Sequence, residues 1–101
     1  MFEESIVELK MKKMLLKGMT LDKNVYICKV ESYESQEKKM TIITEQETLC
    51  KLQLDAIYQC DIYGEDKNLS CEGFIKERYQ SEEGNLLTFY IENGFYEILN
   101  D

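Results

Sequence analysis

A chain of 101 residues, 44% of them hydrophobic, is the size of one domain and carries enough apolar surface for one core. Its formal net charge of −8 disfavours nucleic acid and anionic lipid headgroups as partners, because both need clustered Lys and Arg. No apolar run is long enough for a transmembrane helix, and no apolar signal core follows the N-terminus. We therefore expect a cytoplasmic protein without membrane insertion.

The first element is predicted over residues 3–17, EESIVELKMKKMLLK, as a helix. Acidic residues come early and lysines late, which suits a helix dipole, and Gly18 stands where a helix would stop. Its apolar residues recur at three- and four-residue spacing: Ile6, Val7, Met11, Met14 and Leu15. We expect this face to dock on the domain's own sheet in preference to a membrane surface or a partner. Residues 14–21 could equally begin a strand.

From Val25 onward apolar and polar residues alternate, which predicts strands. The first two are VYICKVES (25–32), where Tyr26, Cys28 and Val30 share a face, and KMTIIT (39–44). The clearest alternation is LQLDAIYQCDI (52–62). Its core-facing residues are expected to be Leu52, Leu54, Ala56, Tyr58, Cys60 and Ile62, with Gln53, Asp55, Gln59 and Asp61 facing solvent.

Turn signals separate the remaining strands. GEDKN (64–68) precedes a strand over 69–79, and SEEGN (81–85) precedes another over 86–92. Asn93-Gly94 then predicts a hairpin into a sixth, C-terminal strand, since both residues tolerate positive φ. The expected fold is mainly β: one small six-stranded antiparallel barrel, closed or split, with its strands within 25–99 and one N-terminal helix.

Catalytic and metal chemistry are disfavoured by what the sequence lacks. There is no histidine, so Ser-His, Cys-His and metal-His arrangements are excluded, and Gly-rich phosphate loops are absent. The four cysteines have no C-x-x-C spacing. Three lie in predicted strands, where free Cys behaves as a buried hydrophobe: Cys28, Cys60 and Cys71, with Cys50 outside. We expect no enzyme, cofactor or metal, and disulfides only in an oxidising compartment.

The stretch NLSCEG (68–73) matches Asn-x-Ser-x-x-Gly, the short consensus by which PilZ domains help to hold cyclic di-GMP. The candidate ligand contacts are Asn68, Ser70, Gly73 and Arg78. A PilZ receptor also uses an upstream R-x-x-x-R segment, whose guanidinium groups pair with phosphates and stack on guanine. No arginine precedes Arg78, which disfavours cyclic di-GMP as a ligand.

The chain resembles the PilZ-associated N-terminal domain of bacterial flagellar brake proteins over about residues 15–98. The likeness lies in a Tyr-containing strand ending at Val30, a short apolar strand at 40–43, a long strand through Ala56 and Tyr58, and GFIKERY at 73–79. The resemblance implies a six-stranded split barrel and a role in cyclic di-GMP signalling or flagellar motility. The resemblance implies that such domains contact a neighbouring PilZ domain or a motor protein, so a stand-alone copy is expected either to have lost the receptor half or to work with a separate partner.

Two functions remain open. The first is a non-catalytic protein-interaction module or homodimer, with Tyr63, Phe74, Tyr90 and Tyr96 as candidate contacts unless they cover a second small core under the helix. The alternative is a receptor for cyclic di-GMP or another anionic ligand, with Arg78 as anion contact unless it pairs with an acidic neighbour across strands. An exposed apolar patch favours the first, and a pocket gathering Arg78, Asn68 and Ser70 favours the second.

Overall fold

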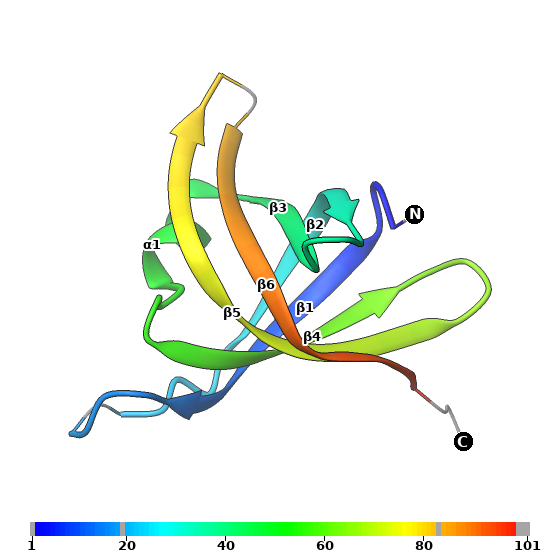
Figure 1. Ribbon diagram of the computed structural model, residues 1–101. Helices are drawn as coiled ribbons and strands as arrows, with labels where there is room; N and C mark the ends of the chain where they lie inside the picture. The colour runs from blue at the N-terminus through cyan, green and yellow to red at the C-terminus, as the bar shows by residue number, and fades with distance from the viewer. Residues whose placement is uncertain (1, 19, 83, 99–101) are drawn as a thin grey trace.

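The computed structural model describes residues 2–18, 20–82 and 84–98, and in them the chain forms a closed, six-stranded antiparallel barrel (Figure 1). The strands follow the order β1-β2-β3-β6-β5-β4 around the barrel, and β4 pairs with β1 to close the ring. The elements are β1 (Ile6–Met14), β2 (Val25–Glu34), β3 (Lys39–Thr44), α1 (Gln46–Lys51), β4 (Ala56–Tyr63), β5 (Asn68–Ser81) and β6 (Gly84–Glu97). The predicted mainly β class and six-stranded barrel are confirmed, and closure leaves no open sheet edge.

The predicted N-terminal helix over 3–17 is wrong, because these residues form β1. Val7, Leu9 and Met11 alternate into the core, while the charged residues between them face outward. β1 is hydrogen-bonded on both sides, to β2 and to β4. This pairing with distant strands outweighs the charge order that favours a helix. Of residues 14–21, Met14 is the last residue of β1, residues 15–18, 20 and 21 lie outside the strands, and residue 19 lies outside the described residues.

The predicted hairpin at Asn93-Gly94 is also wrong. β6 continues through this dipeptide to Glu97, and Asn93 pairs with Glu72 of β5. The positive-φ glycines of the described residues are Gly18 and Gly84, so Gly94 does not adopt the turn conformation. The count of six strands is still right, because β1 takes the place of the expected C-terminal strand.

The strands predicted over 25–32, 39–44 and 69–79 are confirmed, as are the turns after Tyr63 and Ser81. The segment 52–62 differs from its prediction in two places. Leu54 is exposed, because the strand begins only at Ala56, after the unpredicted helix α1. Asp61 is buried, because the Ser70 hydroxyl and the Gln59 amide donate hydrogen bonds to its Oδ1 at 2.7 and 2.9 Å.

Side chains fill the barrel interior. The largest fully buried ones include Tyr58 and Phe89, and three of the four cysteines, Cys28, Cys60 and Cys71, lie in this core as free thiols. At one end, Leu49 of α1 and Leu52 just after it pack into the barrel. Towards the other end of β3, the rings of Phe2, Tyr33 and Phe95 meet with centroids 5.1–5.5 Å apart. Both ends are thereby covered by apolar side chains.

Candidate interaction surfaces

The residues of the Asn-x-Ser-x-x-Gly stretch lie on β5, and two of them are engaged in the sheet. Ser70 is buried and donates its hydroxyl to Asp61. Gly73 lies where the backbone of Tyr90 passes closely, so that an added Cβ would stand 1.9 Å from the Tyr90 carbonyl oxygen. Glycine is needed here for space, which explains this position of the motif without a ligand.

Asn68 begins β5 and borders an open, polar hollow beside the β4–β5 turn. Its carbonyl accepts a hydrogen bond of 2.8 Å from the Ile98 N–H. Three carboxylates and one lysine also line this hollow: Glu65, Asp66, Glu97 and Lys67. The balance of charge there disfavours a phosphate group.

Arg78 binds the end of the short helix. Its Nη1 donates to the Leu49 and Leu52 carbonyl oxygens at 3.2 and 2.7 Å, which satisfies carbonyls that the last turn of α1 leaves without partners. Arg78 follows Asn68 by ten positions on the same strand, which is roughly 30 Å of extended chain. Arg78 and Asn68 accordingly border different hollows, and the structure does not bring Arg78, Asn68 and Ser70 together.

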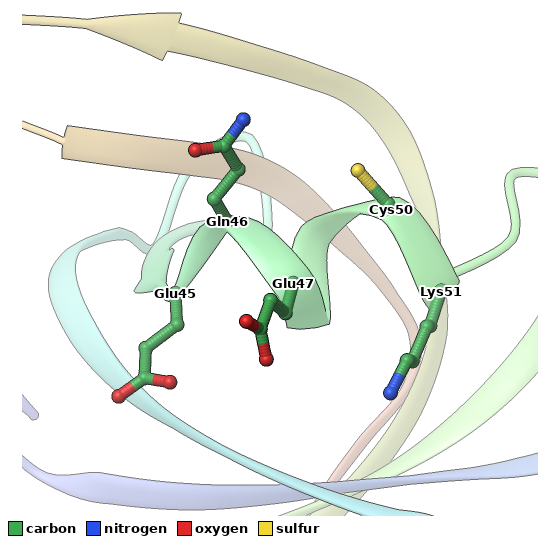
Figure 2. Close-up of a pocket in the computed structure, with 5 residues that line it drawn as sticks. All are labelled: Glu45, Gln46, Glu47, Cys50 and Lys51. Atoms are coloured by element: carbon green, nitrogen blue, oxygen red, sulfur yellow. The ribbon is translucent and has the colours of Figure 1, made fainter.

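Two open hollows flank α1. Figure 2 shows the residues that line one of them, a hollow of about 610 Å³: Glu45, Gln46, Glu47, Cys50 and Lys51. The exposed Cys50 thiol and the Lys51 ammonium point to different sides of the helix, so no base is aligned with the thiol. The second hollow is lined by Leu49, Cys50, Arg78, Tyr79 and Gln80. Neither hollow aligns a nucleophile with a base.

Within the described residues, no group of three or more His, Cys, Asp or Glu side chains could hold a metal ion. The same part of the chain contains no helix long and apolar enough to cross a bilayer.

The four aromatic candidates, Tyr63, Phe74, Tyr90 and Tyr96, divide into a half-buried pair and an exposed pair. They do not cover a second core under an N-terminal helix, because residues 6–14 form the strand β1. Phe74 and Tyr90 are half-buried and stack with centroids 5.8 Å apart, and the Lys76 ammonium lies 5.5 Å from the Tyr90 ring centroid. Tyr63 and Tyr96 are exposed. Tyr63 donates its hydroxyl to Glu8 at 2.6 Å, and this hydrogen bond raises the pKa of Tyr63 to about 12.

Exposed aliphatic side chains gather on the outer side of β1, β2 and β3. The register places Ile6 and Ile43 on either side of Lys29, and Ile27 lies two residues before Lys29 on β2. Ile27 is 65% exposed and Ile6 is 45% exposed, and with the half-buried Ile43 they line a mainly apolar hollow of about 290 Å³. We call Ile6, Ile27 and Ile43 the isoleucine face.

A second group of exposed apolar residues lies at the α1 end of the barrel. Leu15, Leu16 and Leu21 are on the β1–β2 connection, and Leu54 is on the α1–β4 connection. The Leu15 N–H donates to the Asp55 carbonyl oxygen at 2.9 Å, which holds the two connections together. We call these four residues the leucine patch. The sequence reasoning missed its exposure because Leu15 was assigned to the buried face of a helix.

No family model, curated protein or solved structure matches this chain. The class of protein is therefore defined by its own geometry: a small closed β-barrel with a filled interior and apolar residues on its outer surface.

Proposed function

We propose that this chain is a non-catalytic protein-interaction module that binds its partner through the isoleucine face. The observation that supports this most is the 65% exposure of Ile27 in the middle of a β-sheet surface, beside Ile6 and Ile43. Aliphatic side chains gathered on the solvent side of a sheet are typical of a surface that another molecule covers. Lys29 and Glu45 border the same hollow and would supply a polar rim.

The proposed setting is cytoplasmic, in cyclic di-GMP signalling or flagellar motility control. It rests on the resemblance to the PilZ-associated N-terminal domain, to which the six-stranded barrel adds support. The partner that this resemblance favours is a separate protein with a PilZ domain, and a second copy of this chain is the other occupant to test.

A receptor for cyclic di-GMP or another anionic ligand is the alternative function. It rests on the match at Asn68, Ser70 and Gly73. The geometry supports it less well, because Ser70 and Gly73 are engaged in the sheet and Arg78 in the α1 contact.

The test is an isothermal titration with a purified PilZ-domain protein from the same cell, using the wild type, Ile27→Asp and Leu16→Asp. Leu16 is 53% exposed and lies outside the isoleucine face, so Leu16→Asp is the matched control. We expect Ile27→Asp to weaken binding at least tenfold and Leu16→Asp to leave it unchanged. Equal affinity for all three proteins would contradict the assignment of the isoleucine face.

A parallel titration with cyclic di-GMP separates the two functions. Saturable heat at ligand concentrations up to about 1 mM, lost in Asn68→Ala, would favour the receptor. Asn68 is suited to this test because it borders an open hollow, whereas Ser70 is buried and Arg78 is engaged with the end of α1.

A further inference from the structure

Basic side chains concentrate at the end of the barrel that carries the leucine patch, although the whole chain is acidic. Between residues 10 and 23 the sequence contains five lysines, and Asp22 is the sole acidic residue of that segment. The five are Lys10, Lys12, Lys13, Lys17 and Lys23. Because the formal charge of the chain is −8, the negative charge resides in the remainder of the molecule. The protein is therefore polarised, with one basic end.

The acidic groups near this end neutralise it only in part. Asp22 accepts hydrogen bonds from the Tyr26 hydroxyl and from the Asn24 N–H, the latter at 2.9 Å, and the Tyr26 bond lowers the pKa of Asp22. The nearby Lys51 ammonium of α1 lowers it further, and Glu47 in the first turn of the same short helix offsets the charge of Lys51. Asp55 lies beside Leu15, and Lys12 is paired with Glu72 at 2.5 Å.

Three lysines flank the leucine patch without an acidic partner in the part of the chain that the structure describes. Among the described residues, Lys13, Lys17 and Lys23 form no ion pair. Leu15 and Leu16 stand between Lys13 and Lys17 and are 54% and 53% exposed. In Figure 1 the β1–β2 connection projects away from the barrel at the lower left. Lys13 and Lys17 flank Leu15 and Leu16 along the chain, and Lys23 follows Leu21 by two positions, so this projecting apolar tip carries cations.

We propose that the leucine patch docks the domain reversibly on an anionic phospholipid surface. Leu15 and Leu16 would lie at the boundary between headgroups and acyl chains, and Lys13, Lys17 and Lys23 among the headgroups. A lipid surface accepts a convex apolar tip without a preformed pocket and offers anions on all sides of it. The occupant is therefore a membrane surface containing acidic lipids.

The composition of this end favours lipid over a protein partner. Protein interfaces are enriched in aromatic residues and Arg and depleted in Lys, whereas polybasic membrane contacts use Lys readily. The connection at residues 15–24 has no aromatic residue and no arginine. The acidic remainder of the molecule does not prevent docking, because its extents reach 39 Å and charges beyond about 10 Å are largely screened at physiological salt.

The test is vesicle flotation with phosphatidylcholine vesicles and with vesicles that contain about 30 mol% phosphatidylserine. We expect the wild type to bind the phosphatidylserine vesicles at least tenfold more tightly than the neutral ones, and to dissociate at high salt. The double variants Leu15→Ser/Leu16→Ser and Lys13→Gln/Lys17→Gln should each lose at least tenfold, because these side chains are exposed and outside the core. Ile27→Ser, on the isoleucine face, is the matched control and should bind as the wild type does.

A second measurement reports the depth of the tip. The chain has no tryptophan, so Leu16→Trp introduces a single reporter whose emission should shift to the blue with phosphatidylserine vesicles, while Ile27→Trp should not shift. Equal binding to both kinds of vesicle, no binding at all, or a shift in Ile27→Trp instead of Leu16→Trp would overturn the proposal. If the leucine variants weaken the PilZ-protein titration instead, the patch is a protein contact and the membrane proposal is refuted.

Discussion

Replacing Gly73 by alanine should destabilise the barrel strongly. An added Cβ would stand 1.9 Å from the carbonyl oxygen and 2.9 Å from the carbonyl carbon of Tyr90, and 3.1 Å from the Cα of Ile91. All three are backbone atoms, so no side-chain rotation can relieve the overlap and β6 itself must move. Overpacking in a core typically costs 1–3 kcal/mol, and the backbone contact here places Gly73→Ala at about 3 kcal/mol or more.

For a domain of this size a loss of about 3 kcal/mol corresponds to a fall in Tm of about 12 °C or more. The assay is thermal and urea unfolding followed by circular dichroism. Gly94→Ala is the matched control, because its Cβ would meet nothing within 4 Å, and its stability should stay within about 0.5 kcal/mol of the wild type.

The result also separates the two explanations of the Asn-x-Ser-x-x-Gly match. If the free energy of unfolding of Gly73→Ala, like that of Gly94→Ala, lies within about 1 kcal/mol of the wild-type value, the backbones of β5 and β6 do not approach each other closely at Gly73. Gly73 would then be free to serve a ligand, and the structural explanation of the motif would be refuted.

Arg78→Met removes the Arg78 contacts to the end of α1 and should lower the free energy of unfolding, measured in urea, by about 1–2 kcal/mol. The control Gln80→Ala, at an exposed neighbouring residue, should leave the free energy of unfolding nearly unchanged. Equal stability of the two variants would refute the role assigned to Arg78. Tyr63 should ionise near pH 12 in an absorbance titration, and Glu8→Ala should lower that pKa towards 10. Because the pKa of Tyr63 is raised in the folded state, this hydrogen bond contributes fully to stability below about pH 10, and its contribution is lost as the pH rises towards 12. A Tyr63 that titrates near pH 10 would show that the hydrogen bond to Glu8 does not form. A thiol reagent should modify the exposed Cys50 at once in the folded protein. Burial raises the pKa of Cys28, and the neighbouring Cys71 thiol together with burial raises the pKa of Cys60, so both thiols should be unreactive. Rapid modification of more than one thiol would contradict the burial of the other three. The three thiols that should react only on unfolding are Cys28, Cys60 and Cys71.

The strands that could be predicted from the sequence are those with one buried and one solvated face. In 25–32 the spacing of Tyr26, Cys28 and Val30 at every second position predicts a strand, and the structure buries all three, while Ile27 between them is exposed. In 3–17, by contrast, Val7 and Met11 fit both a period of two and a period of four. Hydrogen bonds to β2 and β4 stabilise the strand over the helix, and the local sequence pattern does not reveal these partners because they lie outside the segment.

The same limit applies to the candidate site. Ser70 is a candidate ligand contact in the alternative function, and its partner in the structure is Asp61, which the alternation predicts to face solvent. Arg78 is the candidate anion contact of the alternative function, with an acidic neighbour across strands as the other interpretation, and its acceptors in the structure are carbonyls of residues 26 and 29 positions earlier, at the end of a helix that the sequence did not indicate. The contacts of Ser70 and Arg78 depend on which strands are neighbours in the barrel, and the local sequence does not specify those neighbours.

Closure through β1 also has a consequence for the order in which the protein can fold during synthesis. β1 leaves the ribosome before the other five strands, but its second neighbour is β4, so that Ile6 must wait for Tyr63 before the ring is complete. Until then the β1–β2 hairpin carries Val7, Leu9 and Met11 on an uncovered face, and an isolated hairpin is marginally stable. Lys10 and its neighbouring lysines lie on and directly after this strand, and charges in such positions keep nascent apolar strands from pairing with one another. The basic segment thus protects the chain before the barrel exists.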